Sequence, residues 1–354
     1  MSLKYFRILL WLLFITSCTS TSQPVSVKQA VSVPLVKAIA EKEPALNVSI
    51  VVFGKGQGGS PLRSAEADYL PSVLRETLVE SGHWGAVRVV PRLDPTAEVL
   101  VTAEIRSSNG VDLVLHVRAG DSTGRVWIDK DYSDWSTDHH YDFDEESQVE
   151  PFSDLFNLIA NDMLEARESL QDKELSRILD TSMLRYAVAL SPEVFNRYLK
   201  KNADGTIEVA GLPARTDPMY SRARNIRESE YKFIDIVDEQ YGNFYLKMQE
   251  TYGYWRRYSY ELTTYNEKIE QSGSKRKRSR ESVWVAMEDV YRTYKESKMN
   301  EDALRELASS FDSEITPIVT ELEGTVIELS GTLKAQYDDW RKLLRKIYQA
   351  ETGT

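Results

Sequence analysis

The sequence predicts an α+β fold, namely a small α/β sandwich in the order strand–helix–strand–strand–strand–helix, followed by an elongated antiparallel helical bundle or coiled-coil stalk. Residues 46–170 combine short β-branched runs with turn signals, which favours a sheet covered by helices. Residues 216–350 instead repeat apolar side chains at helical spacing. We interpret residues 171–215, which lie between these two regions, as a connector.

The first region begins with the β-branched run Asn47–Phe53, which ends in a glycine-rich stretch. An amphipathic helix follows, with apolar residues from Ala67 to Val79 on one side and a stop at Ser81-Gly82. Asn109-Gly110 is a strong tight-turn signal between two strands. The segments that predict strands are 47–53, around 86–90, 97–106, 111–119 and 125–132, and the closing helix is predicted at 151–170.

The second region is predicted to hold three long helices. Thr216-Asp217-Pro218 opens the first helix, which would run to residue 271 and be about 80 Å long. Ser272-Gly273-Ser274 breaks it, and a second helix is predicted from about 275 to 311. Thr316-Pro317 starts a third helix, whose apolar spacing over 318–344 follows an eleven-residue repeat. Within the connector, 194–200 is expected to be helical and 206–210 strand-like.

Cys18 is the only cysteine in the chain, and it ends the run Leu13–Cys18. Lys4 and Arg7 precede an apolar stretch that is too short to span a bilayer. This arrangement resembles a bacterial lipobox. The resemblance implies that 1–17 is a signal peptide, that Cys18 is lipidated, for example with palmitate, and that 18–45 tethers the folded part to a membrane. The alternative is an ordinary buried cysteine.

The residues after Cys18 indicate which membrane is expected, and the overall charge bears on the class of partner. Thr19 and Ser20 do not resemble the aspartate of an inner-membrane retention signal, so we expect the periplasmic face of the outer membrane. With one cysteine, no internal disulfide can form. The formal net charge of −11 becomes −13 once Lys4 and Arg7 are removed, which does not favour nucleic acid as a partner.

Three parts of the first region carry a further resemblance: Asn47–Phe53, the helix Asp68–Gly82 leading into Val87–Pro91, and the hairpin around Asn109-Gly110. Residues 46 to about 170 resemble a periplasmic domain of envelope lipoproteins. That group includes the curli secretion lipoprotein, the lipoprotein activators of penicillin-binding proteins and the N-terminal domain of the Tol-system propeller protein. The resemblance implies an adaptor or assembly domain without catalytic chemistry. The long helical extension departs from this pattern.

Two clusters in the helical region are candidate binding sites. A basic cluster between the first and second helices could bind anionic lipid headgroups or phosphate-bearing glycans, or be a solvated helix tip. Its residues are Lys275, Arg276, Lys277, Arg278 and Arg280. An aromatic cluster places side chains on every face of one helix, and could be a partner interface, a sugar-stacking surface or simply buried in the bundle. Its residues are Tyr252, Tyr254, Trp255, Arg256 and Tyr258.

Signals for catalysis or cofactors are weak. Asp138-His139-His140 with Asp142 and Asp144 could suggest a metal, but adjacent histidines point to opposite sides of an extended segment and no third histidine or cysteine completes a tetrahedral set. Gly54–Gly59 lacks the ending of a phosphate-binding loop, and no nucleophile-elbow pattern occurs. We therefore expect no catalytic residue, no metal, no cofactor and no enzyme.

The leading functional expectation is a lipid-anchored adaptor or scaffold in envelope assembly, export or regulation of cell-wall synthesis. Its α/β domain would dock an envelope protein, and its stalk would reach across the periplasm. The alternative is a lipid- or peptidoglycan-binding module that uses the basic cluster and the aromatic cluster.

Overall fold

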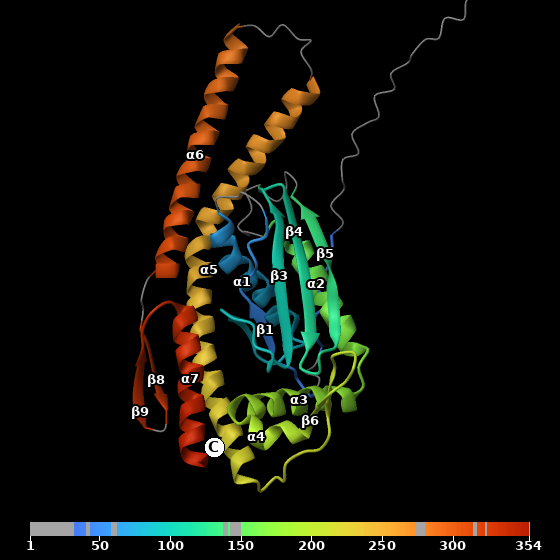
Figure 1. Ribbon diagram of the computed structural model, residues 1–354. Coiled ribbons are helices and arrows are strands. Elements are labelled where there is room, and N and C mark those ends of the chain that lie inside the picture. Colours follow the sequence, from blue (N-terminus) through green and yellow to red (C-terminus); the bar gives the residue numbers. More distant parts are fainter. Residues whose placement is uncertain are drawn as a thin grey trace, which may run out of the picture.

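The computed structural model describes residues 32–39, 43–57, 62–136, 141, 150–272, 280–313, 317–322 and 324–353. These residues form a five-stranded sheet with helices on one face, and a long helix that runs past it (Figure 1). The mixed α and β architecture predicted from the sequence is therefore confirmed. The first part contains β1 (Val48–Val51), α1 (Arg63–Ser81), β2 (Val87–Val90), β3 (Val99–Ser108), β4 (Asp112–Asp121), β5 (Val126–Trp135) and α2 (Ser153–Glu168).

The sheet has the strand order β2-β1-β3-β4-β5. β1 is parallel to both β2 and β3, whereas β3, β4 and β5 form an antiparallel meander. Four strands follow α1, at the four segments that predicted strands there, whereas the summary order counted three. The first of them, β2, is a parallel neighbour of β1 on the side away from β3.

The two faces of the sheet differ. Buried and partly exposed residues alternate along β3 and β4, as expected for a sheet with one face in the core. The buried face packs against α1 and α2, which lie behind the sheet in Figure 1. No helix covers the other face of β3, β4 and β5 in that view, and we call it the open face. Gly82 ends α1 in the left-handed conformation, which confirms the predicted stop.

The stretch interpreted as a connector holds more structure than expected. It contains the 19-residue helix α3 (Asp172–Leu190), which begins with a capping box between Gln171 and Glu174. The segment predicted to be helical at 194–200 is only partly so, because its last residues form a strand that pairs with the predicted strand. The remaining elements here are α4 (Pro192–Phe195), the 3-10 helix η2 (Asn196–Tyr198), β6 (Leu199–Lys201) and β7 (Ile207–Val209).

The third predicted helix is wrong over its first half. Residues there form a hairpin of β8 (Ile318–Leu322) and β9 (Thr325–Leu329), and only α7 (Leu333–Thr352) is helical. Both strands are rich in β-branched residues, and Gly324 turns between them at φ +81°. Residues four apart, such as Ile318 and Leu322, share one face in a strand as well as in a helix, so the spacing alone did not distinguish them.

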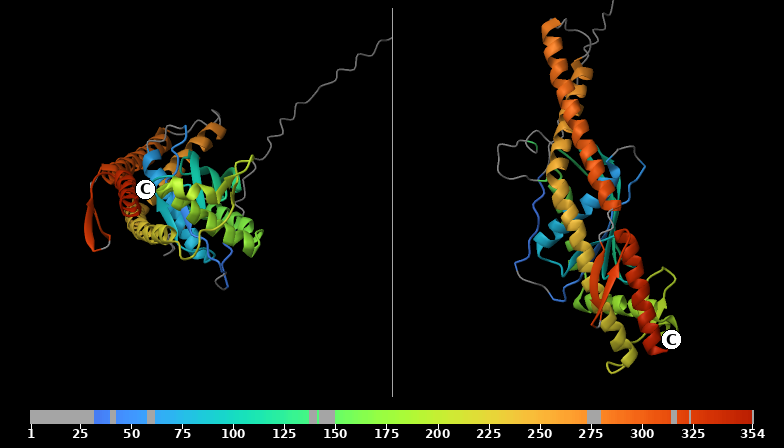
Figure 2. Two further views of the ribbon diagram at one scale, coloured as in Figure 1. Left: turned by 60° about the horizontal axis from the view of Figure 1, so that its bottom comes forward. Right: turned by 90° about the vertical axis from the view of Figure 1, so that its left-hand side faces the viewer.

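The long helix is α5 (Pro218–Ser272), whose 55 residues span about 80 Å. α6 (Arg280–Ser313) lies beside it. Both helices extend beyond the sheet in Figure 1 and in the right-hand view of Figure 2. We call the end of the sheet with the Asn109-Gly110 turn the upper end and the end beside α3 the lower end. The part of α5 after Tyr260, with the neighbouring start of α6, is the arm. The elongated antiparallel helical bundle or coiled-coil stalk stays a prediction.

Candidate functional site

Some of the predicted site residues lie outside the described part of the chain. This holds for Cys18, for the basic residues Lys275–Arg278 and for the histidine segment Asp138–His140 with Asp142 and Asp144. Arg280 begins α6, but its side chain also lies outside the described residues. The proposals that rest on these residues stay predictions.

The predicted aromatic cluster is largely internal. Tyr252, Trp255 and Arg256 are buried against α1 and the sheet, so these three side chains form part of the protein's own core rather than a partner surface. Tyr254 is 37% exposed, and Tyr258 is partly exposed. The hydroxyl of Tyr258 hydrogen-bonds Glu296 on α6, which raises its pKa to about 12 and links the two helices near the arm.

A buried polar network explains why these residues point inward. Glu66 on α1 has no exposed surface, and its carboxylate accepts hydrogen bonds from the hydroxyls of Ser108 (2.5 Å) and Tyr252 (2.9 Å). Burial raises the pKa of Glu66, while the guanidinium groups of Arg63 and Arg256 oppose the increase. Since Glu66 is fully enclosed, no substrate reaches it, and we assign the network to the joining of α1, β3 and α5.

The upper end of the sheet also packs directly on α5. Gly110 lies in the β3–β4 turn at φ +84°, and a Cβ atom there would meet the carbonyl oxygen of Arg256 and the Cβ of Ser259, both at 2.8 Å. The Arg256 guanidinium forms an ion pair with Glu150, just before α2. The sequence signal for a turn at Asn109-Gly110 was correct, but nothing local in the sequence indicated that the turn contacts a helix about 150 residues later.

A second network joins the lower end of the molecule. Arg227 on α5 donates to the carbonyl oxygens of Ser182 (2.7 Å) and Thr96 (2.8 Å). Arg341 on α7 lies between two carboxylates, at 2.9 Å from Glu230 on α5 and 3.3 Å from Asp94 in the loop after β2. Removing one partner of a buried ion pair is strongly destabilising, because the other charge is left buried and unpaired. The network fixes α5 and α7 to the sheet and to α3.

The edge of the sheet at β2 is covered by α5. Asp238 on α5 accepts a hydrogen bond from the backbone N–H of Val89 at 2.7 Å and forms an ion pair with Arg75 of α1 at 2.9 Å. Edge strands carry backbone groups that readily pair with other chains. This edge is therefore closed to a partner strand.

The opposite edge, β5, has a partner strand on one side only among the described residues. Its ten residues include Asp129, Lys130 and Asp131, which are exposed and charged. Charged side chains on an edge strand discourage indiscriminate pairing. Within the described part of the chain this outer side of β5 is unpaired, and we call it the open edge.

Polar and charged side chains form contacts between neighbouring strands on the open face. His116 on β4 contacts Asp131 at 2.8 Å and Asp129 at 3.1 Å on β5. Arg118 lies 3.8 Å from Asp129 and is 60% exposed. A solvated antiparallel face commonly has this composition. Such a face can bind a polar partner without the penalty of exposing a hydrophobic patch.

The first described residues are tied to α2. The backbone N–H of Val33 donates to Asp154 at 2.8 Å, and that of Val36 donates to Asn161 at 3.0 Å. Asn157 donates in turn to the carbonyl oxygen of Val33. These contacts start near the beginning of α2, at the upper end, and continue along the helix. The first described residues thus lie at the end from which the arm extends (Figure 1).

Within the described ranges, no group of three histidine, cysteine, aspartate or glutamate side chains is placed to hold a metal ion. In the same part of the chain, none of the helices has the length and apolar composition needed to cross a membrane. Comparisons with protein-family models, curated proteins and solved structures give no match to this chain.

Proposed function

We propose that this chain is a non-catalytic lipoprotein of the bacterial envelope, anchored through Cys18 at the periplasmic face of the outer membrane. It would act as an adaptor or scaffold in envelope assembly, export or regulation of cell-wall synthesis. The support within the folded part is a sheet with one open face and one open edge, held rigidly to a long helix by two buried polar networks. That arrangement suits docking rather than chemistry.

A further observation supports the proposal: the first described residues lie at the same end of the molecule as the arm. Thirteen residues lie between Cys18 and Ser32, and the fourteen Cα-to-Cα steps that join these two residues (32 − 18) can span at most about 50 Å when extended. The arm continues about 18 Å beyond Tyr260, because α5 has 12 further residues there. An anchor at Cys18 would therefore hold the upper end near its membrane.

This geometry favours a different orientation from the one expected from the sequence. The stalk was expected to reach across the periplasm, away from the anchor. With the upper end at the membrane, the arm points toward that membrane, and the lower end with α3 and the β6–β7 hairpin faces the periplasm. We propose this orientation for the anchored protein.

The same observation favours a second candidate function. α5 ends at Ser272 and α6 begins at Arg280, and the basic residues Lys275–Arg278 link these two helix ends. An arm directed at the anchoring membrane would bring the cluster to lipid headgroups, where each charge gains about 1 kcal/mol near an anionic surface. Peptidoglycan binding by the arm is the related possibility.

The anchor and the orientation are tested together in cells. Labelling with palmitate should mark the wild-type protein and not Cys18→Ala. A photo-crosslinking residue at Asn266, exposed on the arm, should capture lipid, whereas one at Ala203, exposed in the β6–β7 turn, should capture protein. Lipid captured at Ala203 and not at Asn266 would reverse the proposed orientation. Label retained by Cys18→Ala would remove the anchor.

The second candidate is tested by sedimentation of the full chain with liposomes of defined anionic content or with purified sacculi. Replacing Lys275, Arg276, Lys277, Arg278 and Arg280 with glutamine should reduce liposome sedimentation if the arm binds lipid. Unchanged sedimentation and an unchanged cellular phenotype would leave the adaptor function alone.

A further inference from the structure

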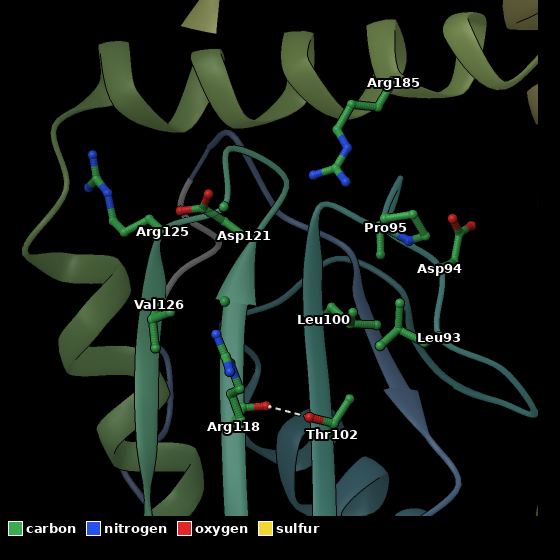
Figure 3. Close-up of a pocket in the computed structure, with 13 residues that line it drawn as sticks. Leu93, Asp94, Pro95, Leu100, Thr102, Arg118, Asp121, Arg125, Val126 and Arg185 are labelled. Atoms are coloured by element: carbon green, nitrogen blue, oxygen red, sulfur yellow. Dashed lines mark hydrogen bonds between the residues drawn. The ribbon is translucent and has the colours of Figure 1, made fainter. Parts of the chain in front are cut away.

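A hollow lies at the lower end of the open face, between the sheet and α3 (Figure 3). It has a volume of about 230 Å³, and its walls come from the loop after β2, from β3 and β4, from the β4–β5 turn and from α3. No predicted site residue lines it. Its lining residues belong neither to the anchor nor to the arm, so what it binds does not depend on the proposed function.

Two guanidinium groups extend toward this hollow from opposite walls. Arg185 reaches from α3 toward the sheet, and Arg118 reaches along β4 toward α3 (Figure 3). A third arginine, Arg125, points away from the space between them and pairs with Glu174 at 2.7 Å. Two positively charged side chains therefore face the hollow, and the third, Arg125, is already paired with a carboxylate.

Among the described residues, neither guanidinium group has a carboxylate within hydrogen-bonding distance. One amino group of Arg185 donates to the carbonyl oxygen of Ser122 at 2.7 Å, which uses one of its five donors on an uncharged acceptor. Arg118 lies 3.8 Å from Asp129, too far for a hydrogen bond. Burial lowers the pKa of Arg185, and the charge of Asp94 opposes the decrease. An incoming anion would therefore meet an Arg185 guanidinium that has already lost part of its hydration, beside an Arg118 side chain that is 60% exposed.

The two acidic residues of the lining are engaged elsewhere. Asp121 accepts hydrogen bonds from the backbone N–H of Thr123 and the indole N–H of Trp127, both at 2.8 Å. Asp94 accepts hydrogen bonds from the N–H and the hydroxyl of Thr96, both at 2.9 Å, and also pairs with Arg341. Asp94 is thus paired with a cation, whereas Asp121 keeps its negative charge, and its hydrogen bonds hold that carboxylate toward Thr123 and Trp127.

An apolar wall completes the hollow. Leu93 and Val126 are unusually exposed for aliphatic residues, at 57% and 47%, and Leu100 lies between them on the sheet. Single exposed aliphatic residues are common, but these line one space together with the two guanidinium groups. The volume is below the 300–1,000 Å³ typical of sites for drug-sized ligands. It suits an end group rather than a whole ligand.

We propose that this hollow binds a carboxylate carried on a short aliphatic stem, with Arg118 and Arg185 holding the two oxygens and Leu93, Leu100 and Val126 contacting the stem. Arginine matches the planar carboxylate with two parallel donors. A phosphate has a third oxygen to satisfy. The hydroxyl of Thr102 already donates to the carbonyl oxygen of Arg118. Apart from the paired Arg125, the side chains that line the hollow therefore offer only the two guanidinium groups as donors.

The experiment uses the full chain in detergent and titrates N-acetyl-leucine, with binding followed by ligand-observed NMR. The neutral N-acetyl-leucinamide and hexyl phosphate are compared at equal concentrations, up to about 10 mM, because an end group of this size binds weakly. We expect N-acetyl-leucine to bind, the amide not to bind, and added salt to weaken the binding. Absence of N-acetyl-leucine binding, or equal binding of the amide, would overturn the proposal.

Variants assign the donors. Arg185→Gln and Arg118→Gln should each weaken binding about tenfold or more. The matched control Arg125→Gln should change it less than about twofold, since that side chain points away and is paired. Arg118 is largely exposed, so its variant should fold even if Arg185→Gln does not. Equal losses for Arg125→Gln and Arg118→Gln, or tighter binding of hexyl phosphate than of N-acetyl-leucine, would refute the carboxylate assignment.

Discussion

Asp68 on α1 is a residue whose ionisation affects stability near neutral pH. Burial, together with the nearby carboxylate of Asp312 on α6, raises its pKa to about 7, and Lys55 offsets part of this. The unfolded chain releases the same proton near pH 4. The folded state therefore binds more protons between about pH 4 and pH 7, and stability falls as the pH rises through this window.

Asp68→Asn removes this ionisation. We expect the variant to be more stable than the wild type by roughly 1–2 kcal/mol at pH 8, with no gain at pH 4, because one pKa unit corresponds to about 1.4 kcal/mol and partial exposure reduces the effect. Urea unfolding at the two pH values measures it. Asp302→Asn, on an exposed side chain of α6 (72%), is the matched control and should show no pH-dependent gain. An equal gain for Asp68→Asn at both pH values would contradict the assignment.

Gly110 gives a second prediction at the residue scale. Both Gly110 and Gly205 have positive φ, but only Gly110 faces another element, while nothing lies within 4 Å of a Cβ atom at Gly205. Gly205→Ala should cost about 1 kcal/mol of unfolding free energy from backbone strain alone. Gly110→Ala should cost at least about 1 kcal/mol more, because the added methyl group meets α5. Chemical unfolding compares the two variants, and equal losses would mean that the contact with α5 yields easily.

Local chemistry decides which residue-level features the sequence could predict. A turn at Asn109-Gly110 follows from two adjacent residues, and it was predicted correctly. The inward orientation of Tyr252 and Arg256 depends on partners such as Glu66 and Glu150, which are more than 100 residues away in the sequence. The sequence pattern left burial and interface equally open for this cluster. Only the fold decides between them.

The attachment of α7 to α5 is the clearest prediction at the element scale. Arg341→Met would leave the carboxylates of Glu230 and Asp94 buried without their shared cation, and should cost about 3 kcal/mol of unfolding free energy. Arg341→Met combined with Glu230→Gln should cost less than the single change, because one buried charge is removed as well.

Urea unfolding of the two single variants and the double variant measures this coupling. Arg345→Met is the matched control, since Arg345 lies one turn later on α7 and is exposed. Its loss should be near zero. If Arg345→Met cost as much as Arg341→Met, the effect would belong to helix α7 as a whole and not to the buried pair.

Among the helices and strands, the sequence predicted most accurately those in which one apolar period continues over many residues. The strongly patterned helix starting at Pro218 was recovered almost completely, and so were the strands of the meander. The β8–β9 hairpin was missed because its strands are only five residues long and fit two periods equally well. α3 was missed because its region was interpreted as a connector, although the capping residues Gln171 and Glu174 mark its start.

For the whole molecule, hydrogen exchange should divide α5 into two parts. Amides between Glu230 and Arg256 lie in the stretch that packs on the sheet, α1 and α7, and they should exchange slowest. Amides after Tyr260 lie in the arm and should exchange faster, since fewer buried contacts hold them. Measurement by mass spectrometry on the full chain tests this. Uniform protection along α5 would mean that the arm packs against something further.

The continuity of α5 has a mechanical consequence. The helix is held against the rest of the fold as far as Arg256, and the 12 residues after Tyr260, about 18 Å, extend beyond that support. A tilt of about 5° around Tyr260 would displace the far end of α5 by roughly 2 Å. A force applied at the tip of the arm would thus be transmitted to the strands through the few buried side chains that join α5 to the sheet.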